Sequence, residues 1–83
     1  MLSIDLQEGL DGYATNFTCQ LLRLICKADK GNFEKLRKGF PVEAKAIEIY
    51  RTDCPYTEGA GMRSVDWGKL AKRAKEEVDN AII

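Results

Sequence analysis

Two stretches of this chain repeat apolar residues at the three- and four-residue steps of an α-helix. Within residues 65–81 the repeated positions are Trp67, Leu70, Ala71, Ala74, Val78 and Ala81. Within residues 13–28 they are Ala14, Phe17, Leu21, Leu24, Ile25 and Ala28. A helix with such a stripe is stabilised mainly by burying the stripe against another element. The two patterns therefore predict an all-α core that contains both helices.

The stretch KADKGNFEKLRKGFPVEAKAIEIY, in the middle of the chain, concentrates residues that begin and end helices. Asp29 is placed to cap a short helix, with Asn32 as the competing cap. We expect Gly39 to end that helix in the left-handed conformation, and Pro41 to occupy the first position of the next helix. This stretch therefore predicts a helix–Gly-Phe-Pro corner–helix unit, with a ligand-binding loop as the alternative interpretation.

Residues 1–12 have two interpretations. Leu2, Ile4 and Leu6 alternate as in a strand or an extended arm, whereas Ser3 suits the start of a helical turn. We expect a loosely held N-terminal arm.

The segment PYTEGAGMR has the composition of a loop, and Ser64 after it suits the N-cap of the last helix. The sequence thus predicts a single helical domain over residues 1–83, folded as a small bundle of three to four helices. The expected helices span residues 13–28, 32–38, 41–53 and 65–81.

Composition excludes several classes of protein. Apolar residues make up 45% of the chain and charged residues 31%, which is typical of a folded domain and not of a disordered segment. The 13 Lys and Arg residues balance 13 Asp and Glu residues, so the net positive charge of a sequence-independent nucleic-acid binder is missing. The chain has neither a signal-peptide pattern nor an apolar run of membrane-spanning length. We expect a cytoplasmic protein that does not contact a membrane.

The size of the chain bears on its assembly. A domain of 83 residues has a small core, and the apolar stripes of its first and last predicted helices are broad for a monomer. We therefore expect a homo-oligomer.

The chain contains no histidine, so the most common general base and metal ligand is missing. The cysteines Cys19, Cys26 and Cys54 show no C-x-x-C spacing. We expect no metal, no cofactor and no enzymatic activity, and we interpret the cysteines as buried apolar residues in a reducing compartment. A disulfide, including one between subunits through Cys54, is the alternative.

The best candidate ligand site is the run EGAGMRS, which contributes Gly59, Gly61, Arg63 and Ser64. A glycine-rich turn that leads into a helix N-terminus can bind an anion through its backbone amides, and Arg63 adds a forked donor. An inert connection is the alternative. A second candidate is the basic helix face formed by Lys69, Lys72 and Arg73, for which an ordinary solvated face is the alternative.

One pattern resembles a known family. The residues from Ala28 to Glu43 fit A-D-x-x-N-x-x-K-L-R-x-G-F-P-x-E, and with the flanking helices, residues 21–50, they resemble a family of small helical proteins found in bacteriophages and prophages. The resemblance transfers no functional residues, and the EGAGMRS run lies outside it.

The resemblance implies a phage-type binding protein that acts in the host bacterial cytoplasm. Our leading hypothesis is that it counters a bacterial defence system by sequestering a signalling nucleotide, in a site between subunits that uses Arg63 and nearby backbone amides. A first alternative is an inhibitor that binds a host defence protein, such as a CRISPR effector, through a helical surface. A second alternative is a DNA-binding or transcriptional accessory protein that uses the basic helix faces.

Overall fold

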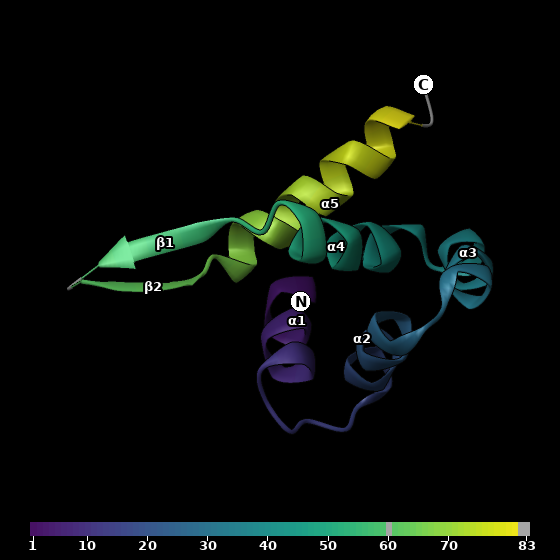
Figure 1. The fold of residues 1–83 in the computed structure, drawn as a ribbon, viewed down its shortest axis with the longest axis horizontal. Coiled ribbons are helices and arrows are strands. Elements are labelled where there is room, and N and C mark those ends of the chain that lie inside the picture. The colour runs from purple at the N-terminus through teal and green to yellow at the C-terminus, as the bar shows by residue number, and fades with distance from the viewer. Residues whose placement is uncertain (60, 82–83) are drawn as a thin grey trace.

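The computed structural model describes residues 1–59 and 61–81, and within them the chain forms five helices and one two-stranded antiparallel sheet (Figure 1). The protein is therefore mostly helical, as expected, but it is not a simple bundle of three to four helices. The elements in chain order are α1 (Leu2–Leu10), α2 (Phe17–Lys27), α3 (Lys30–Gly39), α4 (Pro41–Thr52), β1 (Tyr56–Gly59), β2 (Met62–Val65) and α5 (Trp67–Ala81).

Helix α4 lies at the centre of the fold and contacts α5, α3 and α2 (Figure 1). Its buried residues are small or β-branched, and the alanines let neighbouring helices approach closely. Helix α1 closes the core from the other side, between α2 and α5. The core side chains without solvent exposure are Leu6, Cys19, Leu22, Ile25, Ala44, Ala46, Ile47, Leu70 and Ala74.

The N-terminal segment is a helix, and the prediction of a loosely held arm over residues 1–12 is wrong. Leu2, Leu6 and Leu10 recur every four residues and face the core, where Leu6 is fully buried. Ile4 faces outward. Because Leu2, Ile4 and Leu6 also satisfy a period of two, the sequence pattern alone did not distinguish the two conformations.

The corner between α3 and α4 confirms two predictions and corrects a third. Asp29 caps α3, since its Oδ1 accepts the N–H of Asn32 at 2.8 Å, and Pro41 is the first residue of α4. Gly39, however, is the last helical residue of α3, and Gly61 is the glycine with a positive φ in the described chain. Phe40 forms the corner instead, because its N–H and carbonyl bond to the helices on either side.

The segment predicted as a loop is a β-hairpin that projects from the helices (Figure 1). Strands β1 and β2 pair from Tyr56 opposite Val65 to Gly59 opposite Met62. Ser64 therefore belongs to β2 and does not cap the last helix. Asp66 takes that role, since its Oδ1 accepts the N–H of Lys69 at 3.0 Å.

Arginine side chains connect the end of one helix to the body of another. Arg23 of α2 donates hydrogen bonds to the carbonyls of Gly9 at 2.8 Å and of Glu8 and Gly12 at 3.2 Å, all at the end of α1. The carbonyls of Glu8 and Gly9 lack partners within α1 because a helix leaves its last C=O groups free, and Gly12 lies just beyond the helix. The guanidinium therefore fixes α1 to α2.

Hydrogen bonds from an arginine to a backbone carbonyl also occur at two other helix ends. Arg51 of α4 donates to the carbonyl of Cys26 in the last turn of α2. Arg73 of α5 donates to the carbonyl of Asp53, the residue that ends α4, at 3.3 Å and to its carboxylate at 3.1 Å. Each contact adds a hydrogen bond between two helices that also pack against each other.

The apolar stripe predicted on the helix at 13–28 is only partly buried. Leu24, predicted as a core residue, is 55% exposed, and Phe17 is also exposed, with its ring 6.4 Å from that of Phe40. Helix α3 beside them has no buried residue.

Over the described residues, no helix is long and apolar enough to cross a membrane.

Leu22→Ala and Leu24→Ala form a matched pair on α2. Leu22 is fully buried and Leu24 is 55% exposed, so the first change should lower the free energy of unfolding by about 2–5 kcal/mol and the second by less than about 0.5 kcal/mol. Urea unfolding, at a concentration where sedimentation shows a monomer, measures both. Equal losses would contradict the packing of α2.

Arg23→Ala should lower the free energy of unfolding by about 1–3 kcal/mol, because three backbone carbonyls lose a charged donor. Arg37→Ala is the control, since Arg37 only pairs with Glu34 on the surface of α3. If the two variants unfolded at the same urea concentration, the role of Arg23 would be refuted.

Candidate functional site

A pocket of about 410 Å³ lies at the base of the hairpin. Four parts of the chain meet there: the end of α1, the end of α4, both strands and the start of α5. The lining residues are Gln7, Asp11, Tyr50, Tyr56, Arg63, Ser64, Val65 and Trp67. Three of the eight are aromatic, and one is a cation.

Arg63 and Tyr56 share one face of the hairpin. Tyr56 pairs with Val65, and Arg63 lies two residues from Val65, so the alternation of the strand places both side chains on the same side. The guanidinium carbon lies 4.1 Å from the centroid of the Tyr56 ring, which is a cation–π contact. Arg63 is exposed, so the ring positions a guanidinium that a ligand can reach.

Tyr50 and Trp67 form the inner wall of the pocket. Their rings are stacked, with centroids 5.9 Å apart and planes 15° apart, and both residues pack against the core. Burial raises the pKa of the Tyr50 hydroxyl above its ordinary value of 10.0, and negative charge at Cys54, Cys26 and Asp11 adds to the effect. The helical spacing predicted a core position for Trp67, and the structure shows that Trp67 and Tyr50 are both packed.

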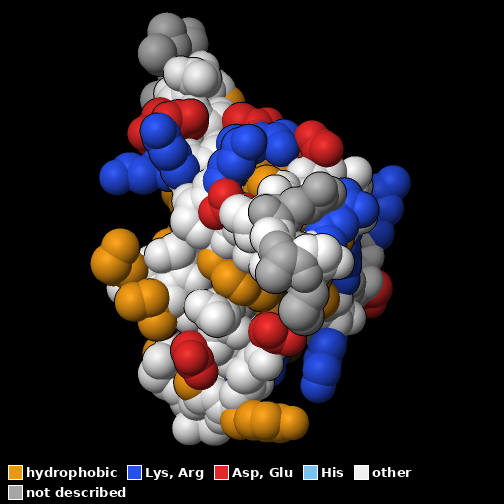
Figure 2. Space-filling model, turned by 90° about the vertical axis from the view of Figure 1, so that its left-hand side faces the viewer, with side chains coloured by type: hydrophobic (Ala, Val, Ile, Leu, Met, Phe, Trp, Pro, Cys, Tyr) orange, Lys and Arg blue, Asp and Glu red, His pale blue; other side chains and the backbone are white. Residues whose placement is uncertain are grey.

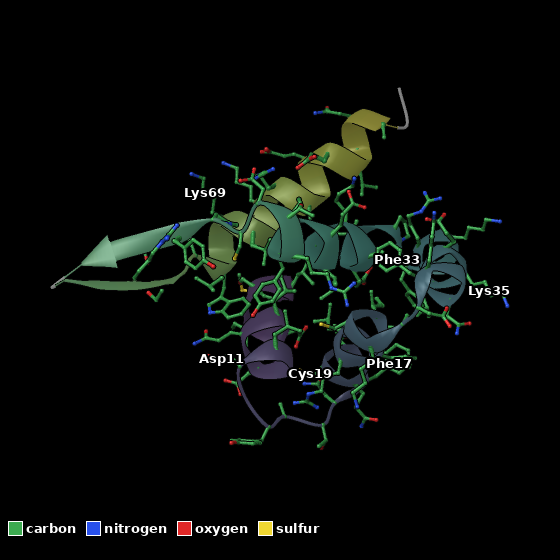
Figure 3. The ribbon with its side chains drawn as sticks, in the orientation of Figure 1. Asp11, Phe17, Cys19, Phe33, Lys35 and Lys69 are labelled. Atoms are coloured by element: carbon green, nitrogen blue, oxygen red, sulfur yellow. The ribbon has the colours of Figure 1, made fainter. Side chains whose placement is uncertain are left out.

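Gln7 and Asp11 line the pocket because α1 is a helix. They are four residues apart, with Gln7 in the last turn of α1 and Asp11 at its C-cap, so they lie on one side of the helix end. Figure 3 shows Asp11 at this end of α1. Neither residue was predicted as part of a site, because an arm was expected over this segment. The four-residue spacing of Leu2, Leu6 and Leu10 is the signal that would have found them.

The residues proposed from the sequence as one anion site are only partly brought together: Arg63 and Ser64 line the hairpin pocket, and Gly59 and Gly61 do not. Gly59 and Gly61 flank the tip of the hairpin, away from its base. Ser64 lies on the other face of the hairpin from Arg63, where its hydroxyl is 3.2 Å from that of Thr57. Of these four residues, Arg63 alone brings its charge to the pocket.

The start of α5 is occupied by a side chain of the protein itself. The carboxylate of Asp66 accepts the N–H of Lys69, and the N–H of Asp66 donates to the carbonyl of Pro55 at 2.9 Å. Val65 is part of a strand. The backbone amides in the first turn of α5 and the guanidinium of Arg63 therefore do not converge on one anion site.

The basic face of α5 is divided in a similar way. Lys69 and Lys72 are exposed, but Arg73 is bound to Asp53 and, at 3.3 Å, to Glu77. Lys69 lies on the opposite side of the hairpin base from Asp11 (Figure 3). This face therefore presents separate lysines and not a continuous cationic stripe.

A larger depression of about 830 Å³ lies between α3, α4 and α5. Four of its five charged groups pair with one another, Arg37 with Glu34 at 2.5 Å and Lys45 with Glu48 at 3.1 Å. No aromatic side chain lines it among the described residues. Most of its charge is neutralised by these pairs and it offers no aromatic surface, so the smaller hairpin pocket is the better candidate.

The cysteines form no disulfide in the described chain. Cys19 is fully buried and its thiol lies 3.5 Å from the carbonyl of Asp5, whereas Cys26 and Cys54 are half-buried. Residues 1–59 and 61–81 contain no group of three or more Cys, Asp or Glu arranged to hold a metal ion.

Comparisons of this chain with protein-family models, with curated proteins and with solved structures found no match. The chemistry of the hairpin pocket is therefore the basis for the function proposed below.

Tyr50 should titrate late. Its raised pKa means that the folded protein binds the phenolic proton of Tyr50 more tightly than the unfolded chain does. The tighter proton binding therefore contributes fully to stability below pH 10.0, and this contribution is lost as the pH rises through the raised pKa. Tyrosinate absorbance of the wild type and Tyr50→Phe measures this, and the substitution should remove the last-titrating component. If the substitution instead removed a component that titrates at lower pH, the burial of the Tyr50 hydroxyl would be contradicted.

Proposed function

We propose that the protein is a non-enzymatic binding protein that takes a nucleotide, or a chemically similar anionic aromatic molecule, in the hairpin pocket. The observation that carries this proposal is the combination of three aromatic side chains with one exposed arginine in a single pocket. Aromatic rings and guanidinium planes offer stacking surfaces to a base. The forked N–H donors of arginine match the oxygens of a phosphate.

The charges in the pocket favour one orientation of such a ligand. Arg63 attracts the phosphate, whereas the carboxylate of Asp11 repels it and instead accepts hydrogen bonds from the amino or imino groups of a base. The base therefore lies toward α1 and the phosphate toward the hairpin. Tyr50 and Trp67 form a wall that the core holds in place.

The size of the pocket limits the ligand. A volume of about 410 Å³ lies within the roughly 300–1,000 Å³ typical of small-molecule sites. A double helix needs a broad basic surface, and the neutral composition of the chain and the internal ion pairs of Arg73 argue against one. A small nucleotide fits these constraints better than duplex DNA does.

The biological role that we propose follows from the resemblance to small phage proteins. Sequestering a signalling nucleotide counters a bacterial defence system and requires binding without turnover. A pocket with rings, one arginine and one carboxylate supports binding, and it contains no histidine that would act as a general base.

Arg63→Ala should weaken nucleotide binding at least about tenfold, because a charge-assisted hydrogen bond and its cation–π support are lost together. A thermal-shift screen of cyclic and linear nucleotides identifies the ligand, and calorimetry then measures its affinity. Tyr56→Phe should retain most of the binding, because the ring that supports Arg63 is kept.

Lys69→Ala is the matched control for this experiment. It also removes one exposed positive charge, but from outside the pocket, so binding should be unchanged. Equal losses in Arg63→Ala and Lys69→Ala would indicate non-specific attraction and refute the site. Chromatography of the recovered ligand checks for turnover, and any conversion would refute the non-enzymatic role.

A further inference from the structure

The charges of this chain are segregated although they balance overall. Residues 1–22 carry three acidic side chains, Asp5, Glu8 and Asp11, and no Lys or Arg. Residues 27–38 carry five basic and two acidic side chains, a formal charge of +3. Figure 2 shows the hairpin side of the molecule, where Lys and Arg gather in the upper part beside acidic side chains and hydrophobic side chains are exposed lower down.

The acidic region includes an outward helix face that nothing in the fold covers. Met1 is 87% exposed and Ile4 is 55% exposed. Glu8 follows Ile4 by four residues and is exposed as well, so it lies on the same side of α1. We call Met1, Ile4 and Glu8 the α1 stripe. It has two apolar side chains at one end and a carboxylate at the other.

The basic region includes a groove of about 600 Å³ between α2 and α3. Its apolar lining comes from Leu24, Ala28 and Leu36. Lys27 and Lys35 add two positive charges and Asp29 one negative charge, so the lining is net positive. We call this the α2–α3 groove. Helix α3 packs against α4 and buries no residue of its own, so one side of the groove is open, and Lys35 points away from the body of the protein (Figure 3).

We infer that the α1 stripe of one copy of this chain docks in the α2–α3 groove of a second copy. Ile4 then covers Leu24 and Leu36, and Glu8 lies beside Lys27 and Lys35. A second copy is the occupant because the chain itself carries both the acidic apolar helix and the basic apolar groove, and an amphipathic helix in an apolar groove is a common recognition mode.

This contact joins two different surfaces, so it is heterologous. Repeated from copy to copy, it closes into a ring or extends into a chain of subunits, unlike a two-fold dimer in which each patch meets itself. Neither surface includes Arg63, Tyr50, Tyr56 or Trp67, so assembly and ligand binding are measured separately.

The test uses the full chain in sedimentation velocity over a range of concentrations and salt. The wild type should exceed the monomer mass of 9.3 kDa and should dissociate as salt screens the charges. Glu8→Lys alone and Lys35→Glu alone should each weaken association at least about tenfold. An equimolar mixture of the two variants should restore association, because every stripe then meets a groove of opposite charge.

Two further variants make the result specific. Lys75→Glu makes the same charge change as Lys35→Glu on an exposed site of α5 outside both surfaces, and it should not alter association. Leu24→Asp should abolish association while circular dichroism stays that of the folded wild type, because Leu24 is exposed. A strict monomer, an unaffected Lys35→Glu variant, or a mixture that does not recover would each overturn the inference.

Discussion

The hydrogen bonds from Arg23 to the carbonyls of Glu8, Gly9 and Gly12 are the contact on which the N-terminal half of the fold depends. A helix of nine residues is marginal by itself, and its free carbonyls need partners. Arg23 supplies a partner from α2 and thereby places Leu6 in the core. The same placement brings Asp11 under the hairpin, so the pocket depends on a residue that does not line it.

The arginines of this chain make two kinds of contact, those that hold the fold together and one that is open to a ligand. The chain has five arginines. Arg23, Arg51 and Arg73 bond to helix-end carbonyls of other elements, and Arg37 pairs with Glu34 within its own helix. Arg63 differs from these four because its guanidinium lies over an aromatic ring in an open pocket. It is therefore the arginine best placed to meet a ligand.

Zero net charge excluded a broad cationic field but not a local one. The acidic residues Asp5, Glu8 and Asp11 lie on or at the end of α1, whereas the basic residues of 27–38 lie on α3 and the end of α2, so the charge is unevenly distributed although it balances overall. The small core explains why apolar side chains remain exposed in both regions. Helices α1 and α3 are too short and too peripheral to bury all of their apolar residues within one chain of 83 residues.

The sequence by itself determined the features that rest on local chemistry. Asp29 caps α3 and Pro41 begins α4 because an Asx side chain and a fixed φ act within one turn, and the helix that ends near Ala81 follows its apolar period. The sequence also identified Arg63 as a candidate ligand residue. It did not determine that Leu24 is exposed, since a helical stripe does not reveal how much of its width a neighbour covers.

Tertiary structure decided what depends on contacts between distant segments. Leu2, Ile4 and Leu6 fit two periods, and the packing of Leu6 against α2 and α5 selected the helix. The hairpin formed because two short strands pair with each other and its base rests on the packed aromatics Tyr50 and Trp67. The pocket itself joins four segments separated by many residues, and no pattern along the chain encodes such a meeting, because it follows from how the helices pack.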